Sequence, residues 1–249
     1  LLIANIVNHS DTIGGNGVSA DWPGFARRTV ESQLGEGAMF VPIIGTAGNI
    51  NHFDVASDLN QTCYAEAERI GTGIGATILN ALDSLKPCCE MPLESRFTEV
   101  YVPGHEVSDE EYNEALATVE KYKDEPDVSA SDDLTSEDLA RKLPKVLKHF
   151  AKQVLILRDE PKNTTFPLPA IFVNGVAILG VPGEPFVEIG LEIRKEIFAD
   201  KPQTLCSIMN NGSGSGYIPN LWNYRRGGYE NTPRSNPFSI HTVSVLKNV

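Results

Sequence analysis

Residues that could bind a metal ion or transfer a proton follow predicted strands at four places in the sequence. They are His9 and Asp11 at the first place, Asn49, Asn51 and His52 at the second, Glu184 at the third, and Tyr217 with Tyr229 at the fourth. His, Glu and Tyr all carry atoms that can bind zinc, and a catalytic zinc site keeps one position open for water. Zinc-bound water supplies hydroxide near neutral pH. The spacing alone does not establish such a site, because the sequence has no HExxH, GxSxG or P-loop motif.

Apolar runs predict the strands that position these residues. Residues 1–7 and 37–45 (GAMFVPIIG) have the composition of buried strands, and each run is followed by a polar loop. Helices are predicted at 22–34 and 63–85, so the first third alternates strand and helix as an α/β domain does. Because strand ends in such a sheet gather at one edge, we expect the polar groups to meet there.

The rest of the chain continues this mixture of strands and helices. The patterns predict an alternating strand, a helix with a capping box, a helical segment interrupted or kinked at proline, a hairpin, a further helix and a short strand before a Gly/Ser loop. The strand is expected at 96–104, the capping box at Ser108 with Glu111, and the helical segment with Pro144 at 135–157. The hairpin turns at Asn174-Gly175, the further helix begins near Glu184, and the short strand and its loop lie within 204–220.

The predicted helix at 63–85 contains GTGIGA, which loosely resembles a dinucleotide-binding fingerprint. That fingerprint requires a strand immediately before it and a helix that opens at it. Helix-forming sequence precedes it here, so we interpret the small residues as sites of close helix packing.

The net charge of −12 is concentrated in one segment. Residues 106–138 hold thirteen acidic side chains and two lysines, so the rest of the chain is nearly neutral. We interpret 105–160 as an acidic helical segment with a solvated surface. The acidic balance argues against nucleic acid as the main partner, because phosphate binding needs a basic patch. No apolar run approaches the ~18 residues that a transmembrane helix needs.

Four segments together resemble the neutral ceramidase family, also called neutral/alkaline non-lysosomal ceramidases. They are NHSDTIGGNGVSADWPG, FVPIIGTAGNINHFD, VAILGVPGEPFVEIGLEIR and NNGSGSGYIPNLWNYRRGGYE. Each motif is weak alone, but their order makes the set fairly specific, and the resemblance spans nearly all of residues 1–231. It implies an α/β fold with a mixed β-sheet core flanked by helices, and a single catalytic-type domain over residues 1–249.

The resemblance also implies a site. The family hydrolyses the amide bond of ceramide with one zinc ion held by two His, one Glu and one Tyr. His9 matches the second zinc histidine, Glu184 the glutamate of Pro-Gly-Glu, and Tyr217 the tyrosine of Gly-Tyr. Tyr229 matches the tyrosine that hydrogen-bonds the substrate carbonyl or the oxyanion. The family's first zinc histidine and an active-site arginine lie upstream and have no counterpart here, so we expect a fragment that lacks the N-terminal part of the domain.

One position departs from the family pattern. Asn51 stands where the family has the Ser of Gly-Asp-Val-Ser-Pro, and an amide can orient a substrate or water but cannot do hydroxyl chemistry. Either the zinc-water route needs no Ser, or the substrate differs, or activity is reduced. The neighbouring His52 is either a proton relay or a hydrogen-bonded structural histidine. Together with Tyr229, Asn51 and His52 are the candidate catalytic residues.

Other polar residues have alternative interpretations. Asp11 could orient His9 or another group, or make a local turn contact. Glu184 could favour the N-terminus of the following helix through the helix dipole. The remaining histidines and an arginine pair are predicted to be surface or helix residues: His105, His149, His241, Arg225 and Arg226.

The leading hypothesis is a zinc-dependent amidohydrolase, a hydrolase acting on linear amides. It would cleave ceramide or a related N-acyl lipid into a fatty acid and a sphingoid base or amine. The alternatives are a diverged, non-catalytic member that binds a lipid or sugar, and a metal-dependent hydrolase of other bonds such as esters. The resemblance implies a lipid or other N-acyl amide as partner, and a secreted protein that is extracellular, periplasmic or membrane-associated.

Overall fold

The computed structural model describes residues 1–15, 17–87, 93–128, 134, 138, 141–173, 176–199, 205–208 and 216–248. Contacts divide the chain into two compact units. The first unit comprises Leu1–Glu99 and Pro167–Ser215, and the second comprises Val100–Phe166 and Gly216–Val249. That residues 1–249 form one ceramidase-like catalytic domain stays a prediction.

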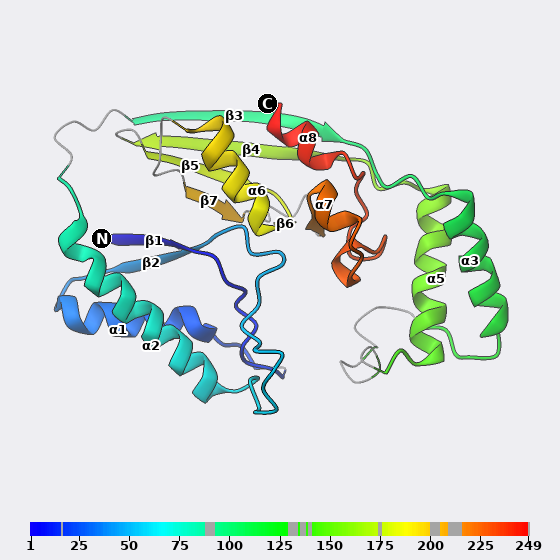
Figure 1. The fold of residues 1–249 in the computed structure, drawn as a ribbon, viewed down its shortest axis with the longest axis horizontal. Helices are drawn as coiled ribbons and strands as arrows, with labels where there is room; N and C mark the ends of the chain where they lie inside the picture. The colour runs from blue at the N-terminus through cyan, green and yellow to red at the C-terminus, as the bar shows by residue number, and fades with distance from the viewer. Residues whose placement is uncertain are drawn as a thin grey trace. The chain divides into compact units, whose positions relative to one another are not determined.

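The first unit contains the predicted strand–helix–strand–helix order (Figure 1). Strand β1 (Leu2–Ile6) pairs in parallel with β2 (Phe40–Ile44). Helix α1 (Asp21–Leu34) connects the two strands, and α2 (Tyr64–Ala81) follows β2 and continues into the 3-10 turn Leu82–Ser84. The core between these strands and helices is built from residues of all four elements: Trp22, Ala26, Val30 and Phe40, with Leu2, Ala4, Ile6, Ile44, Ile70, Ile74, Ile78 and Leu79 packed against them.

The GTGIGA segment packs α2 against α1. A Cβ atom on Gly71 would contact the Trp22 carbonyl oxygen and would lie 2.6 Å from the Phe25 Cβ. A Cβ atom on Gly75 would lie 2.8 Å from the Thr29 Cβ. Real Cβ atoms do not approach this closely, so both positions need glycine for the helices to touch. The interpretation of this segment as a helix-packing motif is confirmed.

A second sheet has the order β3-β4-β5-β7, with β3 (Leu93–Val102), β4 (Thr164–Val173), β5 (Val176–Val181) and β7 (Leu205–Ile208). Strands β4 and β5 are antiparallel, with Val173 opposite Val176, and β5 is parallel to β7. The predicted hairpin therefore forms, while its Asn174-Gly175 turn and the Gly/Ser loop at 209–215 lie outside the described residues. Parallel and antiparallel pairs together with helices confirm the α/β fold class.

The segment after β5 corrects one predicted boundary. Glu184 was expected near the start of a helix, but it lies in the short strand β6 (Glu184–Pro185). Helix α6 (Val187–Glu192) begins three residues later and continues into a π-helical turn, Ile193–Ile197.

The second unit contains two packed helices, α3 (Asp109–Lys121) and α5 (Pro144–Asp159). The predicted capping box begins α3, because Ser108 Oγ accepts from the Glu111 N–H and the Glu111 carboxylate accepts from the Ser108 N–H. The sequence predicts an interruption or a kink at Pro144, and the structure has the interruption: Leu143 is extended, with ψ 152°, and α5 begins at this proline. A proline at the first helical position lacks only an N–H that would have no partner within the helix.

Shorter elements complete the second unit: β8 (Tyr217–Ile218), α7 (Leu221–Tyr224), a 3-10 turn (Tyr229–Asn231) and α8 (Thr242–Lys247). The expectation of surface histidines is wrong for His105, which is only 6% exposed, while His149 lies in α5 as a helix residue but is 7% exposed. Within the described part of the chain, no helix is both long and apolar enough to cross a membrane.

Candidate functional site

His9 lies in the loop that follows β1 and is held by hydrogen bonds of its backbone and its ring. Its backbone N–H donates to the Ile50 carbonyl at 3.2 Å, and its ring Nδ1 lies 2.8 Å from the same oxygen. The Trp22 indole N–H donates to the His9 carbonyl at 2.7 Å. Because a carbonyl oxygen can only accept, Nδ1 carries a proton. The other ring nitrogen, Nε2, faces the Glu184 carboxylate at 3.1 Å.

Glu184 reaches His9 because the loop after β2 lies directly against β6. The Gly48 N–H donates to the Pro185 carbonyl at 2.9 Å. A Cβ atom on Gly48 would collide with the Glu184 carbonyl oxygen, so a larger residue would push the two segments apart. The absence of a side chain at position 48 thus brings together two residues that are 175 positions apart in the sequence.

Asn49 fixes the start of the helix that follows Glu184. Its side-chain oxygen accepts from the Val187 N–H at 2.8 Å, and its amide nitrogen donates to the Glu188 carboxylate at 2.9 Å. The Asn49 side-chain oxygen thus gives a partner to the Val187 N–H, which has none within α6. Asn49 therefore positions β6 and α6, while Asn51 and His52 contact other residues.

The electrostatics of the His9–Glu184 pair favour a charged histidine. The hydrogen bond that the His9 ring donates to the Glu184 carboxylate is the main reason that the pKa of His9 rises from 6.5 to about 9. Burial lowers this pKa, and the Ile50 hydrogen bond and the charges of Asp11 and Glu184 raise it. At neutral pH the two side chains thus form an ion pair.

Asp11 joins the loops after β1 and β2. Its carboxylate accepts from the Asn51 side-chain amide at 3.0 Å, across forty positions of sequence. His52 Nδ1 lies 3.3 Å from the same carboxylate, outside hydrogen-bond alignment, and His52 Nε2 lies 2.8 Å from the Gln61 carbonyl. The His52 side chain is only 1% exposed. Asp11 thus contacts side chains of a distant loop, and the His52 ring is enclosed within that loop.

The two predicted site tyrosines meet in the second unit. The hydroxyl oxygens of Tyr217 and Tyr229 are 2.5 Å apart, and the rings pack edge to face with centroids separated by 5.4 Å. The Tyr217 N–H donates to the Ser235 carbonyl at 2.8 Å, which holds β8 in place. Tyr229 is 56% exposed. The pair therefore presents two hydroxyl groups that share one hydrogen bond, with Tyr229 open to solvent.

The structure brings together three sets of predicted site residues: His9 with Glu184, Asp11 with Asn51 and His52, and Tyr217 with Tyr229. Among the described residues, no group of three or more His, Cys, Asp and Glu side chains is arranged to hold a metal ion. Trp22 and Glu188 also support the site, and neither is predicted from the sequence. The only signal for Trp22 was an aromatic residue beside Pro23 in the first turn of a predicted helix.

A second histidine–glutamate pair lies in the second unit. His105 Nε2 is 3.1 Å from a Glu111 carboxylate oxygen, and His105 Nδ1 is 3.4 Å from the Tyr224 hydroxyl. Burial, helped by the negative charge of Glu111, raises the pKa of Tyr224 above its usual value of 10.0. This cluster connects the start of α3 to α7.

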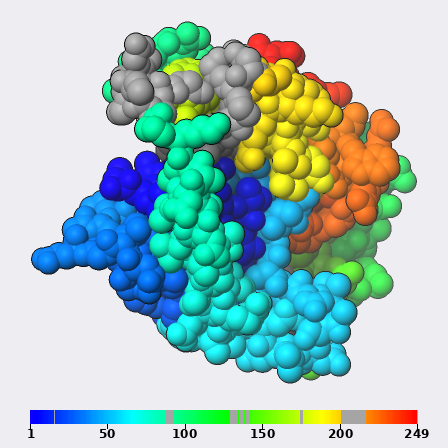
Figure 2. Space-filling view, turned by 60° about the vertical axis from the view of Figure 1, so that its left-hand side comes forward, coloured from blue at the N-terminus to red at the C-terminus, as the bar shows by residue number. Residues whose placement is uncertain are grey.

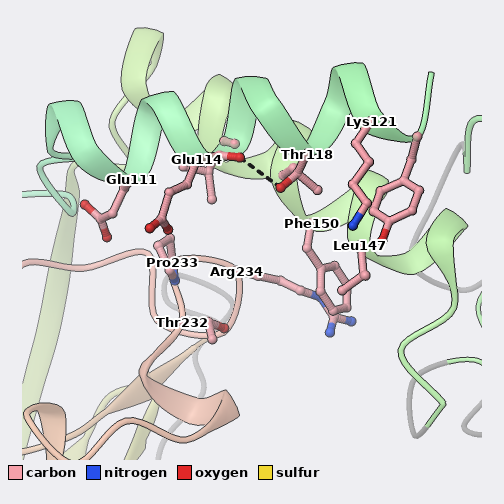
Figure 3. Close-up of a pocket in the computed structure, with 13 residues that line it drawn as sticks. Glu111, Glu114, Thr118, Lys121, Leu147, Phe150, Thr232, Pro233 and Arg234 are labelled. Carbon is pink, nitrogen blue, oxygen red and sulfur yellow. Dashed lines mark hydrogen bonds between the residues drawn. The ribbon is translucent and has the colours of Figure 1, made fainter.

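A groove of about 460 Å³ lies between α3, α5 and the loop at 232–234 (Figure 3). Its floor is apolar, and the Arg234 guanidinium lies 4.1 Å from the centroid of the Phe150 ring. Glu111 and Glu114 lie toward one end of this groove, and Lys121 toward the other (Figure 3). None of the site residues predicted from the sequence lines this groove.

Comparison with solved structures places the fold among those of ceramidases. The neutral ceramidase from Pseudomonas aeruginosa matches with a TM-score of 0.62 and 16% sequence identity, over 99% of this chain and 42% of that chain. A ceramidase complexed with C2 matches with a TM-score of 0.62 and 15% identity, over 99% of this chain and 44% of that chain. At this identity the likeness shows the fold, and the chain spans less than half the length of either ceramidase. No protein-family model and no curated protein matches the sequence.

Proposed function

We propose that this protein is a ceramidase-like, zinc-dependent amidohydrolase that cleaves the N-acyl amide bond of ceramide or a related lipid. The observation that carries the proposal is the convergence of His9 Nε2 and the Glu184 carboxylate, 3.1 Å apart, at the ends of strands in a fold similar to that of ceramidases. Water would add to the acyl carbon, the C–N bond would break, and the amine would take up a proton.

Two donor atoms of the first unit are spaced nearly as two zinc ligands would be, which supports the proposal. Two ligand atoms of a tetrahedral zinc, each bonded at about 2.0–2.2 Å, are about 3.3–3.6 Å apart. His9 Nε2 and Glu184 Oε2, at 3.1 Å, are close to this separation. The Nδ1 hydrogen bond to Ile50 directs Nε2 toward the carboxylate, as carbonyl partners of zinc-bound histidines commonly do. Since a histidine ligand must be neutral, zinc and the proton compete for Nε2.

Each residue has a role in this proposal. Zinc, when bound, polarises the amide carbonyl and lowers the pKa of bound water. His9 and Glu184 would hold it, and Trp22 and Ile50 fix the position of His9. The resemblance adds Tyr217 as a further ligand. It also gives Tyr229 the role of donating a hydrogen bond where negative charge develops on the carbonyl oxygen. Both roles stay predictions.

Asn51 and His52 are proposed to act at the same strand ends. The Asn51 amide is held by Asp11, which leaves its position fixed for orienting a substrate or water molecule. A proton-relay role for His52 stays a prediction, and its enclosed ring with a carbonyl partner is also what a structural histidine requires. A lipid substrate and an extracellular or periplasmic location are likewise predictions from the resemblance.

The decisive experiment measures zinc content and amide hydrolysis together in the full protein. His9→Ala and Glu184→Ala should lower zinc occupancy and reduce hydrolysis of an N-acyl lipid at least about 100-fold, because even indirect supports of a zinc ligand are worth about 10–100-fold. The matched controls are His241→Ala and Glu68→Ala, both exposed and outside the site.

Two outcomes would reject the assignment. A protein without stoichiometric zinc would favour the non-catalytic, lipid- or sugar-binding alternative. Unchanged activity in both site variants would place the chemistry elsewhere. Comparing an amide lipid with its ester analogue separates an amidase from a hydrolase of other bonds, since both would use the same metal site.

A further inference from the structure

The loop between β2 and α2 exposes large apolar side chains. Within residues 52–61, Phe53 is 48% exposed, Leu59 is 80% exposed and Val55 is 99% exposed. None of the three belongs to the apolar core of the first unit. Single exposed apolar residues are ordinary, but three within ten residues of one loop mark an interaction surface.

Hydrogen bonds from Gln61 hold this loop in one shape. Its side-chain oxygen accepts from the Asp54 N–H at 2.7 Å, and its side-chain nitrogen donates to the Asp54 carbonyl at 2.9 Å. Its own carbonyl oxygen lies 2.8 Å from His52 Nε2. Gln61 thus links the two arms of the loop, so the exposed side chains are presented by an ordered backbone.

The tip of the loop is a turn with aliphatic residues at its centre. The Ser57 N–H donates to the Asp54 carbonyl at 3.1 Å, and the Asp54 carboxylate accepts from the Ala56 N–H at 2.9 Å. Val55 and Ala56 therefore occupy the two central positions. Gly, Pro, Asn and Asp dominate such positions, so a fully exposed valine there is unusual for a turn that meets only water.

This loop adjoins the candidate site. The Phe53 ring lies against the His52 ring, with centroids 4.1 Å apart. Just before the loop, the Ile50 carbonyl accepts the hydrogen bonds of His9. Figure 2 shows the part of the chain near residue 55, in light blue, at the surface of the molecule.

We propose that loop 52–61 docks into the interfacial region of a lipid bilayer, with Val55, Leu59 and Phe53 as the inserted side chains. The choice of a bilayer as partner rests on the proposed lipid substrate. A lipid amide leaves a membrane only with difficulty, so an apolar contact beside His9 would hold the site at the surface that contains the substrate.

The charge around the loop selects among bilayers. Asp54 and Asp58 alternate with its apolar residues, and residues 29–68 contain no Lys or Arg. Docking is therefore driven by burial of apolar side chains, and anionic lipids add no attraction through this surface. A zwitterionic bilayer such as phosphatidylcholine is the expected partner.

Flotation of the full protein with phosphatidylcholine vesicles tests the proposal. Replacing the two most exposed side chains, Val55→Asp with Leu59→Asp, should lower the bound fraction at least about tenfold, the scale expected for losing one buried aliphatic side chain. Leu85→Asp is the matched control, because Leu85 is 64% exposed and lies beyond the other end of α2. The Val55→Trp variant should bind the vesicles more strongly than the wild-type protein. Brominated lipid chains should quench the tryptophan fluorescence of this variant more than that of the wild-type protein.

Three results would overturn the proposal. They are no flotation of the wild-type protein, equal flotation of the wild-type protein and the double variant, and flotation that rises with phosphatidylglycerol content and is unaffected by the loop substitutions. The proposed function is tested separately, since flotation needs neither zinc nor turnover. If the protein is an amidase, the double variant should lose activity on bilayer-embedded ceramide and keep it on a short, water-soluble amide. Equal losses on both substrates would also contradict docking.

Discussion

Among the residues that the structure describes, two histidine–glutamate pairs have the same separation, 3.1 Å, in two different environments. In the first unit, His9 and Glu184 come from positions 175 residues apart. In the second unit, His105 and Glu111 are six residues apart. The carboxylate of Glu111 also accepts from the Ser108 N–H and hydroxyl, whereas among the described residues Glu184 bonds through its carboxylate to His9 alone. The distance between two groups therefore does not identify a site; the other bonds of each group do.

The surroundings of the histidines differ in the same way. His105 has both ring nitrogens facing protein side chains, Glu111 and Tyr224, and its side chain is 8% exposed. The His9 side chain is 22% exposed, and its Nδ1 faces a backbone carbonyl. The arrangement around His105 stabilises the start of α3. In the arrangement around His9, a ring nitrogen and a carboxylate face each other and could bind the same metal ion.

The largest expected effect separates the two glutamates by function. Glu184→Ala should lower zinc content and reduce amide hydrolysis at least about 100-fold, because it removes a proposed ligand. Glu111→Ala should leave zinc content and activity near those of the wild-type protein. Metal analysis and initial rates on the same preparations test this pair, and equal losses in both variants would contradict the distinction.

The reverse order is expected for stability. Glu111→Ala removes a helix cap and leaves buried His105 without its carboxylate partner, so the free energy of unfolding should fall by about 1–3 kcal/mol. Urea denaturation of chelator-treated proteins measures this without a contribution from bound metal. A larger loss in Glu184→Ala than in Glu111→Ala would show that the pair in the first unit is the structural one.

The pH dependence of stability should report the His9–Glu184 pair. The pKa of His9 is about 9 in the folded protein, whereas the ordinary pKa of a histidine is 6.5. The folded state therefore binds the proton more tightly than the unfolded chain does. Its stabilising contribution is complete below pH 6.5 and is lost as the pH rises through about 9. Urea midpoints of chelator-treated protein across this range should therefore fall, and Glu184→Gln should remove most of that fall. A wild-type slope that this variant leaves unchanged would count against the ion pair.

The smallest effect concerns Tyr224. Its hydroxyl lies 3.4 Å from His105, so Tyr224→Phe should change stability by at most about 1 kcal/mol near neutral pH. The pKa of Tyr224 is raised from 10.0, which means that its contribution is present below this pH and is lost as the pH rises through the folded-state pKa. Unfolding measured at neutral and alkaline pH should show the variant losing less stability than the wild-type protein. The opposite order would contradict the burial of this hydroxyl.

The sequence predicts local elements better than distant contacts. Apolar periodicity correctly predicts β1, α1, β2 and α2, and the Ser108–Glu111 capping box follows from residues three positions apart. At Pro144 the sequence leaves open whether the helical segment is interrupted or kinked, because proline fits the first turn of a helix and also disrupts a helix interior. For Leu143, ψ is 152°, an extended conformation, so the helix begins at the proline.

The candidate site was predictable in part. His9 at a strand end follows from the apolar run before it, but no periodicity connects it to Glu184. That contact depends on the close approach of Gly48 to the β6 backbone, which only the folded chain reveals. His105 was misplaced for a related reason, since its burial comes from Glu111 and Tyr224, and the Tyr224 partner is 119 positions away. The resemblance to ceramidases supplied the pairing that the physical patterns could not.

The contact between α1 and α2 has a consequence for tolerance to mutation. Trp22 donates to the His9 carbonyl, and the Trp22 backbone is also the surface against which Gly71 packs. A methyl group at position 71 would displace α1, and with it the indole that anchors the loop carrying His9. Under the proposed function, a larger residue at position 71 would therefore affect the metal site indirectly, through Trp22. Such a substitution would weaken zinc affinity without altering either of the proposed ligands, His9 and Glu184.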